Sequence, residues 1–569
     1  MRSTDNISAF RLFIVAIVLT GFMWGTSSCK SKKATSKLPG KEFVVTSNYS
    51  GSDVSRMLER ALAEGAEVIR FEKGRFKLSK PLDIDGRNVA IIGESQNHTV
   101  LTADGNSLIR VKAEAMLSMP YMNSVKEGSQ HLNIFQSDGW KKEGIIQLSA
   151  PHGMPEQTSG GYTSHYTGRI TSVDRNRIEL DRPVEIPFRE HITLSWYPST
   201  TFSLKSLTLE ADNTLYMVEI RNCDGVQVEN VKFVTPRKRY MGEYREANPQ
   251  IGVSALGIFA SQDIVVSNCE FEYIWYGLMA HEGCYNVQIV NARAYRSRHV
   301  NNNGVGTDNF TVKNCLAVEC EGGFDSHPTA LGTRFINCVD SLPKEPSKFR
   351  GRRDEIINCR FGHGIELSVD KGISHLFGDS TIIRKTVKNT EFYGEKTLIS
   401  GGNILFYNCR MYAPIVPDLI AGTLTIRNCE IDLHEYKGGH SAALTLGDAS
   451  PDGQSCKHHI ENVRITGPGP NATNLSIGVY LPMRNSGTIA LEDVRVDNFE
   501  KGLVLYGGPE SASRYQQLYV NDMRIENCTY GIFQQEFTKD VKRWDITITS
   551  CRYETNIPGL IREMKETNK

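Results

Sequence analysis

The sequence predicts an all-β protein: a right-handed parallel β-helix solenoid with an N-terminal capping helix and a small inserted β subdomain. A short segment, in which alternating apolar residues lead to a turn-forming residue, recurs along the chain, for example at 226–233, 264–271 and 310–317. The turn-forming residue is an asparagine at Asn230, Asn268, Asn291, Asn314, Asn337, Asn358, Asn389, Asn408 and Asn428. From 268 to 337 successive asparagines are 23 residues apart. A fixed period indicates a solenoid, and alternation over a few residues indicates strands rather than helices.

The remaining elements follow from spacing and turn chemistry. Residues 52–64 carry apolar residues at helical spacing, so we expect a capping helix there. Residues 144–151, 166–173 and 176–184 look like strands but lie outside the regular period, which predicts an insert. In chain order we expect the cap and first coils at 42–107, the insert at 108–200, the solenoid at 201–556 and a polar tail at 557–569.

The N-terminus has the pattern of an export signal. Arg2 and Arg11 precede an apolar stretch at 12–24, and small residues follow before Cys29. A basic region, a short apolar region and small residues are typical of a bacterial secretory signal. The position of Cys29 resembles a lipoprotein site, so we expect a signal peptide at 1–28, a lipidated Cys29 with a tether at 29–41, and a membrane-anchored protein of the cell envelope. A plain signal peptide with an incidental cysteine is the alternative.

The composition excludes some classes of protein. The 569 residues include 65 Lys+Arg and 65 Asp+Glu, and 40% are hydrophobic. This content is too apolar for a disordered chain, and zero net charge argues against a nucleic-acid partner. Twelve cysteines follow Cys29, and most occupy one position of the repeat. We therefore expect stacked buried thiols rather than disulfides. We also expect the protein to be a monomer.

The regular period allows side chains on adjacent coils to be aligned. Adding 23 to Tyr276 gives His299, and adding 23 repeatedly to His281 gives Gly304, His327 and Arg350. We expect these residues to stack in columns, with the glycine leaving room between the histidines. Other polar residues gather around them: Arg298, Asn302, Asp325, Arg352 and Arg353. The alternative is that the asparagines belong to turns and the arginines to ion pairs on a solvated face.

Histidine, tyrosine and arginine together suit β-elimination of a uronic-acid polysaccharide. Arginine can bind the carboxylate with two hydrogen bonds, which makes the C5 proton more acidic. A histidine titrates near neutrality, and a histidine or tyrosine can move the proton. Hydrolysis would need two carboxylates, for which Asp325, Asp354 and Glu366 are available, and it stays open. No cofactor is required; Asp325, His327 and His299 lack the close spacing of a metal site, and Ca²⁺ stays possible.

The order of helix, strand and Ile91-Ile92-Gly93 in residues 52–93 resembles the start of the pectate-lyase-like superfamily and of phage tailspikes. Residues 295–353 resemble the Arg-His, Asp-x-His and Arg-Gly arrangement of tailspike-like proteins. The resemblance implies a polysaccharide lyase of the type that gut bacteria use on acidic glycans, with chondroitin, dermatan or hyaluronan favoured. By this analogy His327 is the base, Tyr276 or His299 the proton donor, and Arg350 and Arg353 with Asn302 bind the carboxylate. A glycan-binding surface protein without activity is the alternative.

Overall fold

The structure is a computed structural model that describes most of the chain after residue 40. The described ranges are 41–105, 107–135, 138–154, 162–212, 214–236, 253–368, 383–417, 422–446, 456–482, 487–506, 516–535, 541–542 and 546–556. The predicted signal peptide, the predicted lipidation at Cys29 and the predicted tail at 557–569 lie outside them. No helix in these ranges combines the length and the apolar character that a membrane crossing needs.

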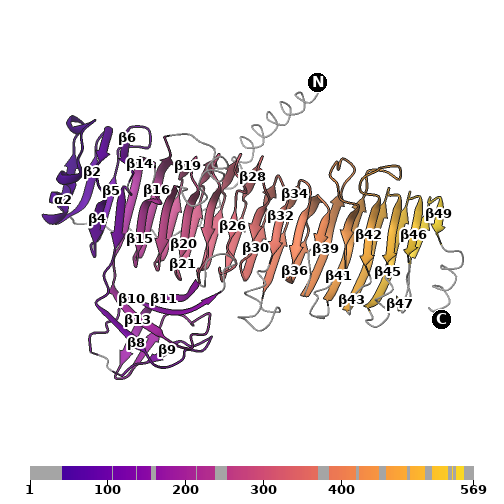
Figure 1. The fold of residues 1–569 in the computed structure, drawn as a ribbon, viewed down its shortest axis with the longest axis horizontal. Coiled ribbons are helices and arrows are strands. Elements are labelled where there is room, and N and C mark those ends of the chain that lie inside the picture. Colours follow the sequence, from indigo (N-terminus) through magenta and orange to yellow (C-terminus); the bar gives the residue numbers. More distant parts are fainter. Residues whose placement is uncertain are drawn as a thin grey trace, which may run out of the picture. The chain divides into compact units, whose positions relative to one another are not determined.

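The described strands after residue 40 form a parallel β-helix with an antiparallel insert, which confirms the predicted fold class (Figure 1). Two parallel sheets make up the solenoid. The 16-stranded sheet, called the site sheet below, carries the candidate site. Its strands are β4 (Leu82–Asp85), β7 (Ile109–Lys112), β15 (Tyr216–Arg221), β17 (Ser254–Phe259), β20 (Tyr276–His281), β23 (His299–Asn303), β26 (Asp325–Ser326), β29 (Ser347–Phe349), β32 (Ile365–Ser368), β35 (Thr397–Ser400), β38 (Ile415–Pro417), β40 (Ala442–Thr445), β42 (Ile477–Pro482), β44 (Lys501–Tyr506), β46 (Tyr530–Gln535) and β49 (Tyr553–Thr555).

The other solenoid sheet has 27 described strands and forms the remaining sides of each coil. They are β1 (Lys41–Val45), β2 (Ala66–Phe71), β3 (Gly74–Leu78), β5 (Val89–Ile92), β6 (Thr99–Asp104), β14 (Phe202–Asp212), β16 (Asp224–Val234), β18 (Gln262–Ser267), β19 (Glu270–Glu272), β21 (Tyr285–Val290), β22 (Arg293–Tyr295), β24 (Asp308–Lys313), β25 (Leu316–Val318), β27 (Thr333–Ile336), β28 (Val339–Ser341), β30 (Arg353–Ile357), β31 (Arg360–Phe361), β33 (Arg384–Lys388), β34 (Glu391–Tyr393), β36 (Gly402–Tyr407), β37 (Arg410–Tyr412), β39 (Gly422–Asp432), β41 (Cys456–Thr466), β43 (Gly487–Asp497), β45 (Gln516–Glu526), β47 (Val541–Lys542) and β48 (Ile546–Thr549).

The recurring asparagines form the corners of the coils. All nine predicted positions have φ between 50° and 56°, a left-handed conformation that asparagine tolerates better than most residues. The side chains also bond along the axis: Nδ2 of Asn291 donates to Oδ1 of Asn268, and Nδ2 of Asn314 donates to Oδ1 of Asn291. The same bond continues through Asn337, Asn358, Asn389 and Asn408. These residues are called the asparagine ladder below.

The interior of the solenoid is one continuous apolar core. It runs from Val45 to Ile532 and includes stacked phenylalanines such as Phe233 and Phe271, whose ring centroids are 5.5 Å apart. The predicted capping helix is present as α2 (Ser55–Ala63), which buries Leu58 and Leu62 against this core; a 3-10 turn, η2 (Ser47–Tyr49), precedes it. Eleven cysteines of the described residues are unpaired, and ten of them are buried, which confirms the predicted free thiols.

The insert is a six-stranded antiparallel sheet with its own core, drawn beside the early coils in Figure 1. Its strands are β8 (Leu117–Tyr121), β9 (His131–Asn133), β10 (Gly144–Met154), β11 (Tyr162–Asp174), β12 (Arg177–Leu180) and β13 (Ile192–Pro198). The predicted range 108–200 also contained β7, but β7 pairs with β4 and β15 inside the solenoid. The insert therefore begins after Lys112.

Candidate functional site

The outward face of the site sheet carries the predicted columns. Tyr276 pairs with His299 across β20 and β23, in the predicted register. Asn303 pairs with Ser326, and Ser326 pairs with Phe349, so the next position along each strand aligns Gly304, His327 and Arg350. Leu278 and Ala280 belong to the core, so Met279 and His281, which alternate with them on β20, face outward. The columns are thus confirmed as neighbours on consecutive coils.

His281 and His327 are close because Gly304 lies between them. Their ring centroids are 6.2 Å apart. A Cβ atom at position 304 would lie 3.0 Å from Cβ of His327 and 3.4 Å from Nε2 of His281. Burial and the charge of Arg350 lower the pKa of His327 to about 3. The imidazole of His327 is therefore neutral at neutral pH and can accept a proton.

A chain of hydrogen bonds connects these histidines to Arg350. Nε2 of His281 donates to Oδ1 of Asn302 at 2.8 Å, and Nδ2 of Asn302 donates to Oδ2 of Asp325 at 2.9 Å. Nη2 of Arg350 donates to both oxygens of Asp325, at 2.8 and 3.0 Å. Burial would raise the pKa of Asp325, but Arg350, His299 and His327 outweigh it and hold that pKa well below its usual range. Asp325 is thus a carboxylate, 2% exposed, that fixes the guanidinium.

Arg350 keeps hydrogen-bonding capacity beyond Asp325. Both of its bonds to Asp325 come from Nη2, and its buried Nε has no partner among the described residues. A buried donor without a partner costs free energy unless a ligand satisfies it. The side chain is 26% exposed, so a ligand can reach it.

Tyr276, Arg298 and His299 form the adjacent part of the site. Nη1 of Arg298 donates to the hydroxyl of Tyr276 at 2.8 Å, and the guanidinium lies 4.4 Å from the ring centroid of Trp275. The ring of His299 stacks on that of Tyr276 at 5.7 Å. Burial raises the pKa of Tyr276, so its hydroxyl carries a proton that it can donate. His299 is 4% exposed, and its Nδ1–H donates to the carbonyl of Gly322, so it supports Tyr276 rather than reaching solvent.

A fully buried ion pair supports the backbone beneath Arg350. Nζ of Lys385 lies 3.1 Å from Oδ2 of Asp354, and both side chains are 0% exposed. The hydroxyl of Ser326 donates to Asp354 and accepts from the backbone N–H of Arg350. These bonds therefore link β26, β29, β30 and β33 directly beneath Arg350 and hold its backbone in place.

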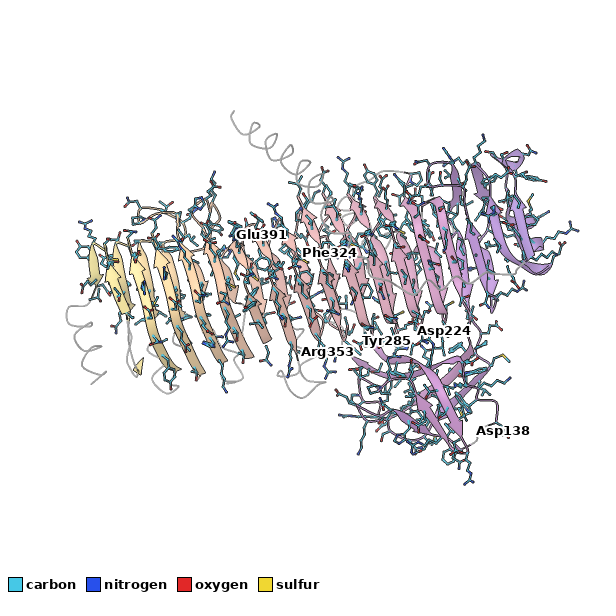
Figure 2. All side chains as sticks on the ribbon, turned by 180° about the vertical axis from the view of Figure 1, so that it is seen from behind. Asp138, Asp224, Tyr285, Phe324, Arg353 and Glu391 are labelled. Carbon is cyan, nitrogen blue, oxygen red and sulfur yellow. The ribbon has the colours of Figure 1, made fainter. Side chains whose placement is uncertain are left out.

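Two predicted binding residues lie elsewhere. Arg352 donates to the carbonyl of Glu185 and forms an ion pair with Glu127 at 3.2 Å. Arg353 forms ion pairs with Glu185 and Asp308 at 3.1 and 3.3 Å. Glu127 and Glu185 belong to the insert, so both arginines attach the insert to the solenoid. The structure does not bring them to the site, because both side chains contact the insert. Figure 2 labels Arg353 at the edge of the solenoid beside the insert.

The carboxylates considered for hydrolysis are occupied. Asp325 is bound to Arg350, and Asp354 is bound to Lys385 inside the core. Glu366 accepts a hydrogen bond from Ser368 and is half-buried, so it is left as a single accessible candidate of the three. Within the described ranges, no three residues among His, Cys, Asp and Glu are arranged to hold a metal ion.

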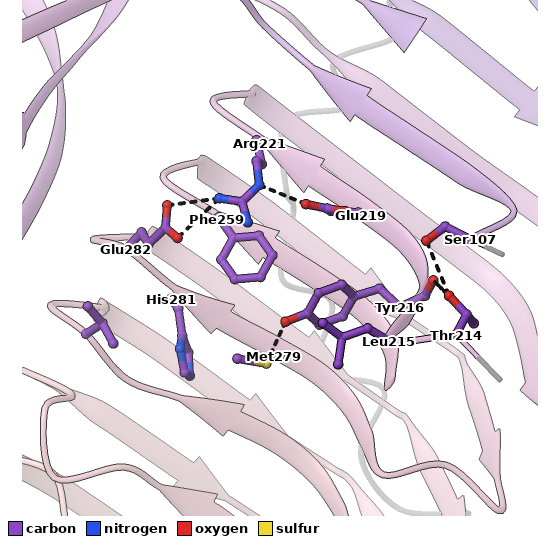
Figure 3. Close-up of a pocket in the computed structure, with 11 residues that line it drawn as sticks. Ser107, Thr214, Leu215, Tyr216, Glu219, Arg221, Phe259, Met279, His281 and Glu282 are labelled. Atoms are coloured by element: carbon purple, nitrogen blue, oxygen red, sulfur yellow. Dashed lines mark hydrogen bonds and ion pairs between the residues drawn. The ribbon is translucent and has the colours of Figure 1, made fainter. Parts of the chain in front are cut away.

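A cavity of about 460 Å³ adjoins the site and was missed by the sequence analysis (Figure 3). It is called the side pocket below, and it is lined by Ser107, Thr214, Leu215, Tyr216, Glu219, Arg221, Phe259, Met279, His281, Glu282 and Val305. Arg221, Phe259 and His281 occupy one row of the site sheet. The sequence did not reveal this row because Arg221 and Phe259 are 38 residues apart, which differs from the period of 23.

The comparisons with known proteins agree with this architecture. No protein-family model and no curated protein matches the sequence. Among solved structures, the tailspike gp61 of Pseudomonas phage phi297 is 15% identical, with a TM-score of 0.55 over 81% of this chain and 76% of that one. The gp54 tailspike of Acinetobacter baumannii bacteriophage AP22, in complex with a capsular saccharide, is 12% identical, with a TM-score of 0.49 over 87% and 77%. The chain thus shares the parallel β-helix fold of a phage tailspike, as the sequence resemblance predicted, and the likeness concerns the fold alone.

Proposed function

We propose that the protein is a polysaccharide lyase that cleaves a uronic-acid polysaccharide by β-elimination, with glycosaminoglycans as the favoured class. The single observation that supports this most is that the neutral imidazole of His327 lies next to Arg350 on consecutive coils of the site sheet. A neutral base beside a fixed cation suits removal of a proton next to a carboxylate, since the cation stabilises the charge that develops.

In this mechanism the exposed part of the Arg350 guanidinium binds the uronate carboxylate. His327 takes the proton from C5, and the electron pair forms the C4–C5 double bond. The bond from C4 to the glycosidic oxygen breaks, and the hydroxyl of Tyr276 donates its proton to that oxygen. Arg298, hydrogen-bonded to Tyr276, stabilises the phenolate left behind. His299 and Asp325 act as positioning residues, one for Tyr276 and one for Arg350.

The occupied carboxylates argue against hydrolysis. A glycosidase of the usual kind needs an acid and a second carboxylate, both reaching the sugar. Asp325 is bound to Arg350 and Asp354 to the buried Lys385, and both carboxylates are at most 2% exposed. Of the three carboxylates only Glu366 stays accessible, and one carboxylate does not make the pair that a usual glycosidase needs.

The test uses the described compact unit, residues 41–569, with chondroitin, hyaluronan, alginate, pectin and ulvan. We expect new ultraviolet absorbance from an unsaturated uronate, and a loss of at least about 10²-fold in His327→Ala. The matched control is His434→Ala, since His434 is exposed and far along the chain. Reducing ends without absorbance would establish a hydrolase instead, and binding without either product a glycan-binding protein.

The cell-envelope location is part of the proposal. The basic residues, the apolar stretch and Cys29 support export followed by lipidation. Labelling cells with a radioactive fatty acid should mark the wild type and leave Cys29→Ser unlabelled. Equal labelling of both proteins would remove the lipid anchor.

A further inference from the structure

The side pocket is continuous with the candidate site. His281 lines the pocket and is hydrogen-bonded to Asn302 of the site. Met279 also lines it, and Met279 pairs with Asn302 on the next coil. Phe259 and Gly304 are two coils apart, which corresponds to about 10 Å at the usual strand spacing. Arg350 lies two further coils along the same row, so sugars of one chain that are not adjacent to each other can occupy the pocket and the site together.

The charges of the side pocket differ from those of the site. Nε of Arg221 donates to Glu219 at 2.8 Å, and Nη1 donates to Glu282 at 3.1 Å (Figure 3). Two carboxylates thus share one guanidinium, which leaves one negative charge uncompensated. A sugar carboxylate placed here would be repelled, whereas hydroxyl and amide N–H groups would find acceptors.

The other walls of the side pocket are aromatic and aliphatic. The rings of Tyr216 and Phe259 lie edge to face, with centroids 5.5 Å apart. The ring of Tyr216 covers Gly257, where a Cβ atom would lie 2.5 Å from Cδ1 of that ring. Leu215 is 58% exposed at the rim. Aromatic walls with a few fixed polar groups are typical of a small-molecule site, and they suit the apolar face of a pyranose or an acetyl group.

We infer that the side pocket binds an uncharged sugar, such as an N-acetylhexosamine, of the same chain as the uronate. The polysaccharide lies along the solenoid axis, with the uronate at Arg350 and the uncharged sugar toward the N-terminal coils. This inference rests on the proposed lyase function. It restricts the substrate to chains in which uronate alternates with an uncharged sugar and excludes uniform polyuronates.

The test measures binding apart from turnover, in a His327→Ala background. Hyaluronan and polygalacturonate hexasaccharides are titrated by calorimetry. We expect hyaluronan to bind at least tenfold more tightly. Tyr216→Ala should weaken hyaluronan binding at least tenfold, and Glu219→Gln should tighten polygalacturonate binding several-fold by removing the excess charge. The matched control is Tyr480→Ala, because Tyr480 lies at an outward position of β42 on the same sheet.

The outcomes separate the two proposals. Equal affinity for the two oligosaccharides, or unchanged hyaluronan affinity in Tyr216→Ala, overturns the side-pocket inference even if the wild type forms unsaturated uronate. If no polysaccharide yields unsaturated uronate but hyaluronan binding depends on Tyr216, the lyase proposal fails and the pocket remains a glycan site. Glu219→Gln keeps an acceptor for Arg221, so it provides a readout if Tyr216→Ala does not fold.

Discussion

The imidazole rings of His281 and His327 lie 6.2 Å apart although their strands are separated by a whole coil. The intervening strand contributes Gly304, whose missing side chain allows the approach. Two imidazoles and the guanidinium of Arg350 are thereby gathered in one row of the site sheet.

Gly304→Ala should reduce turnover more than stability. The added methyl group would lie 3.0 Å from Cβ of His327 and from Oγ1 of Thr329, so His327 must move by a few tenths of an ångström. We expect at least tenfold lower kcat and about 1 kcal/mol lower free energy of unfolding. Steady-state kinetics and denaturant unfolding measure both. Gly439→Ala, where nothing lies within 4 Å, is the control, and unchanged kcat in Gly304→Ala would contradict the arrangement.

Activity should persist in mild acid. The pKa of His327 is lowered to about 3, so the base stays neutral well below the pH at which an exposed histidine becomes protonated. We expect kcat/KM to show no acid limb near pH 6.5, the ordinary histidine value. A pH–rate profile checks this, with circular dichroism at each pH to confirm folding. An acid limb centred near 6.5 would remove His327 as the base.

The same lowered pKa makes stability depend on pH. Between about 3 and 6.5 the unfolded chain binds a proton at this position that the folded chain does not, so the free energy of unfolding falls as pH falls through that window. Above it the contribution is constant. Comparison of wild type with His327→Gln, by urea unfolding at several pH values, should show a shallower slope in the variant.

Lys385→Met should destabilise the protein strongly. It would leave Asp354 charged and unpaired in the core, where both side chains are 0% exposed. We expect a loss of about 3–5 kcal/mol in the free energy of unfolding. Adding Asp354→Asn should restore part of it, because the charge disappears while Ser326 keeps an acceptor. Lys388→Met, on the exposed face of the same strand, is the control in thermal unfolding.

Asp340 should act in the opposite direction to His327. Burial raises its pKa to about 7, despite hydrogen bonds from Ser347 and the N–H of Gly323. The folded chain holds a proton there that the unfolded chain releases above about 4, so stability falls as pH rises from about 4 to 7 and is then constant. Asp340→Asn should remove this slope in urea unfolding. Asp138→Asn, an exposed position on the insert, should leave it intact.

Arg352→Met should loosen the insert and leave the coils folded. The guanidinium of Arg352 is 5% exposed and contacts Glu127 and the carbonyl of Glu185, both of the insert. We expect faster amide exchange and proteolysis within 113–200, with unchanged exchange in β20–β32. Arg189→Met is the control, because Arg189 is exposed. Uniform loosening of the coils would mean that Arg352 supports the solenoid itself.

The coils were predictable because one period controls both fold and site. The constant spacing of 23 residues aligned Tyr276 with His299 and His281 with His327, and it implied the role of Gly304. The spacing did not reveal, however, that Arg353 begins β30 on the other solenoid sheet, so Arg353 was predicted to join the cluster although it pairs with Glu185 of the insert. The side pocket was missed because Arg221 is adjacent to Phe259 in space although the two residues are not one repeat apart in the sequence.

The buried partners were also beyond the sequence. Asp354 was considered available for hydrolysis, because nothing in its neighbourhood indicates that Lys385, on the next coil, enters the core to meet it. Pairs of this kind depend on which face of a strand each residue occupies where the spacing departs from 23 residues, and here it is 31 residues. Only the register of β30 and β33 determines that.

The asparagine ladder has a direction. Every amide from Asn291 to Asn408 donates toward the N-terminal end, and every amide from Asn268 to Asn389 accepts from the C-terminal side, so the amide dipoles add along the axis and polarise one another. An interior member such as Asn314 makes two of these bonds, while the terminal Asn268 makes one. Replacing an interior amide therefore divides a cooperative chain of hydrogen bonds, whereas replacing a terminal one only shortens it. We expect substitutions of these asparagines to be tolerated better toward the ends of the ladder.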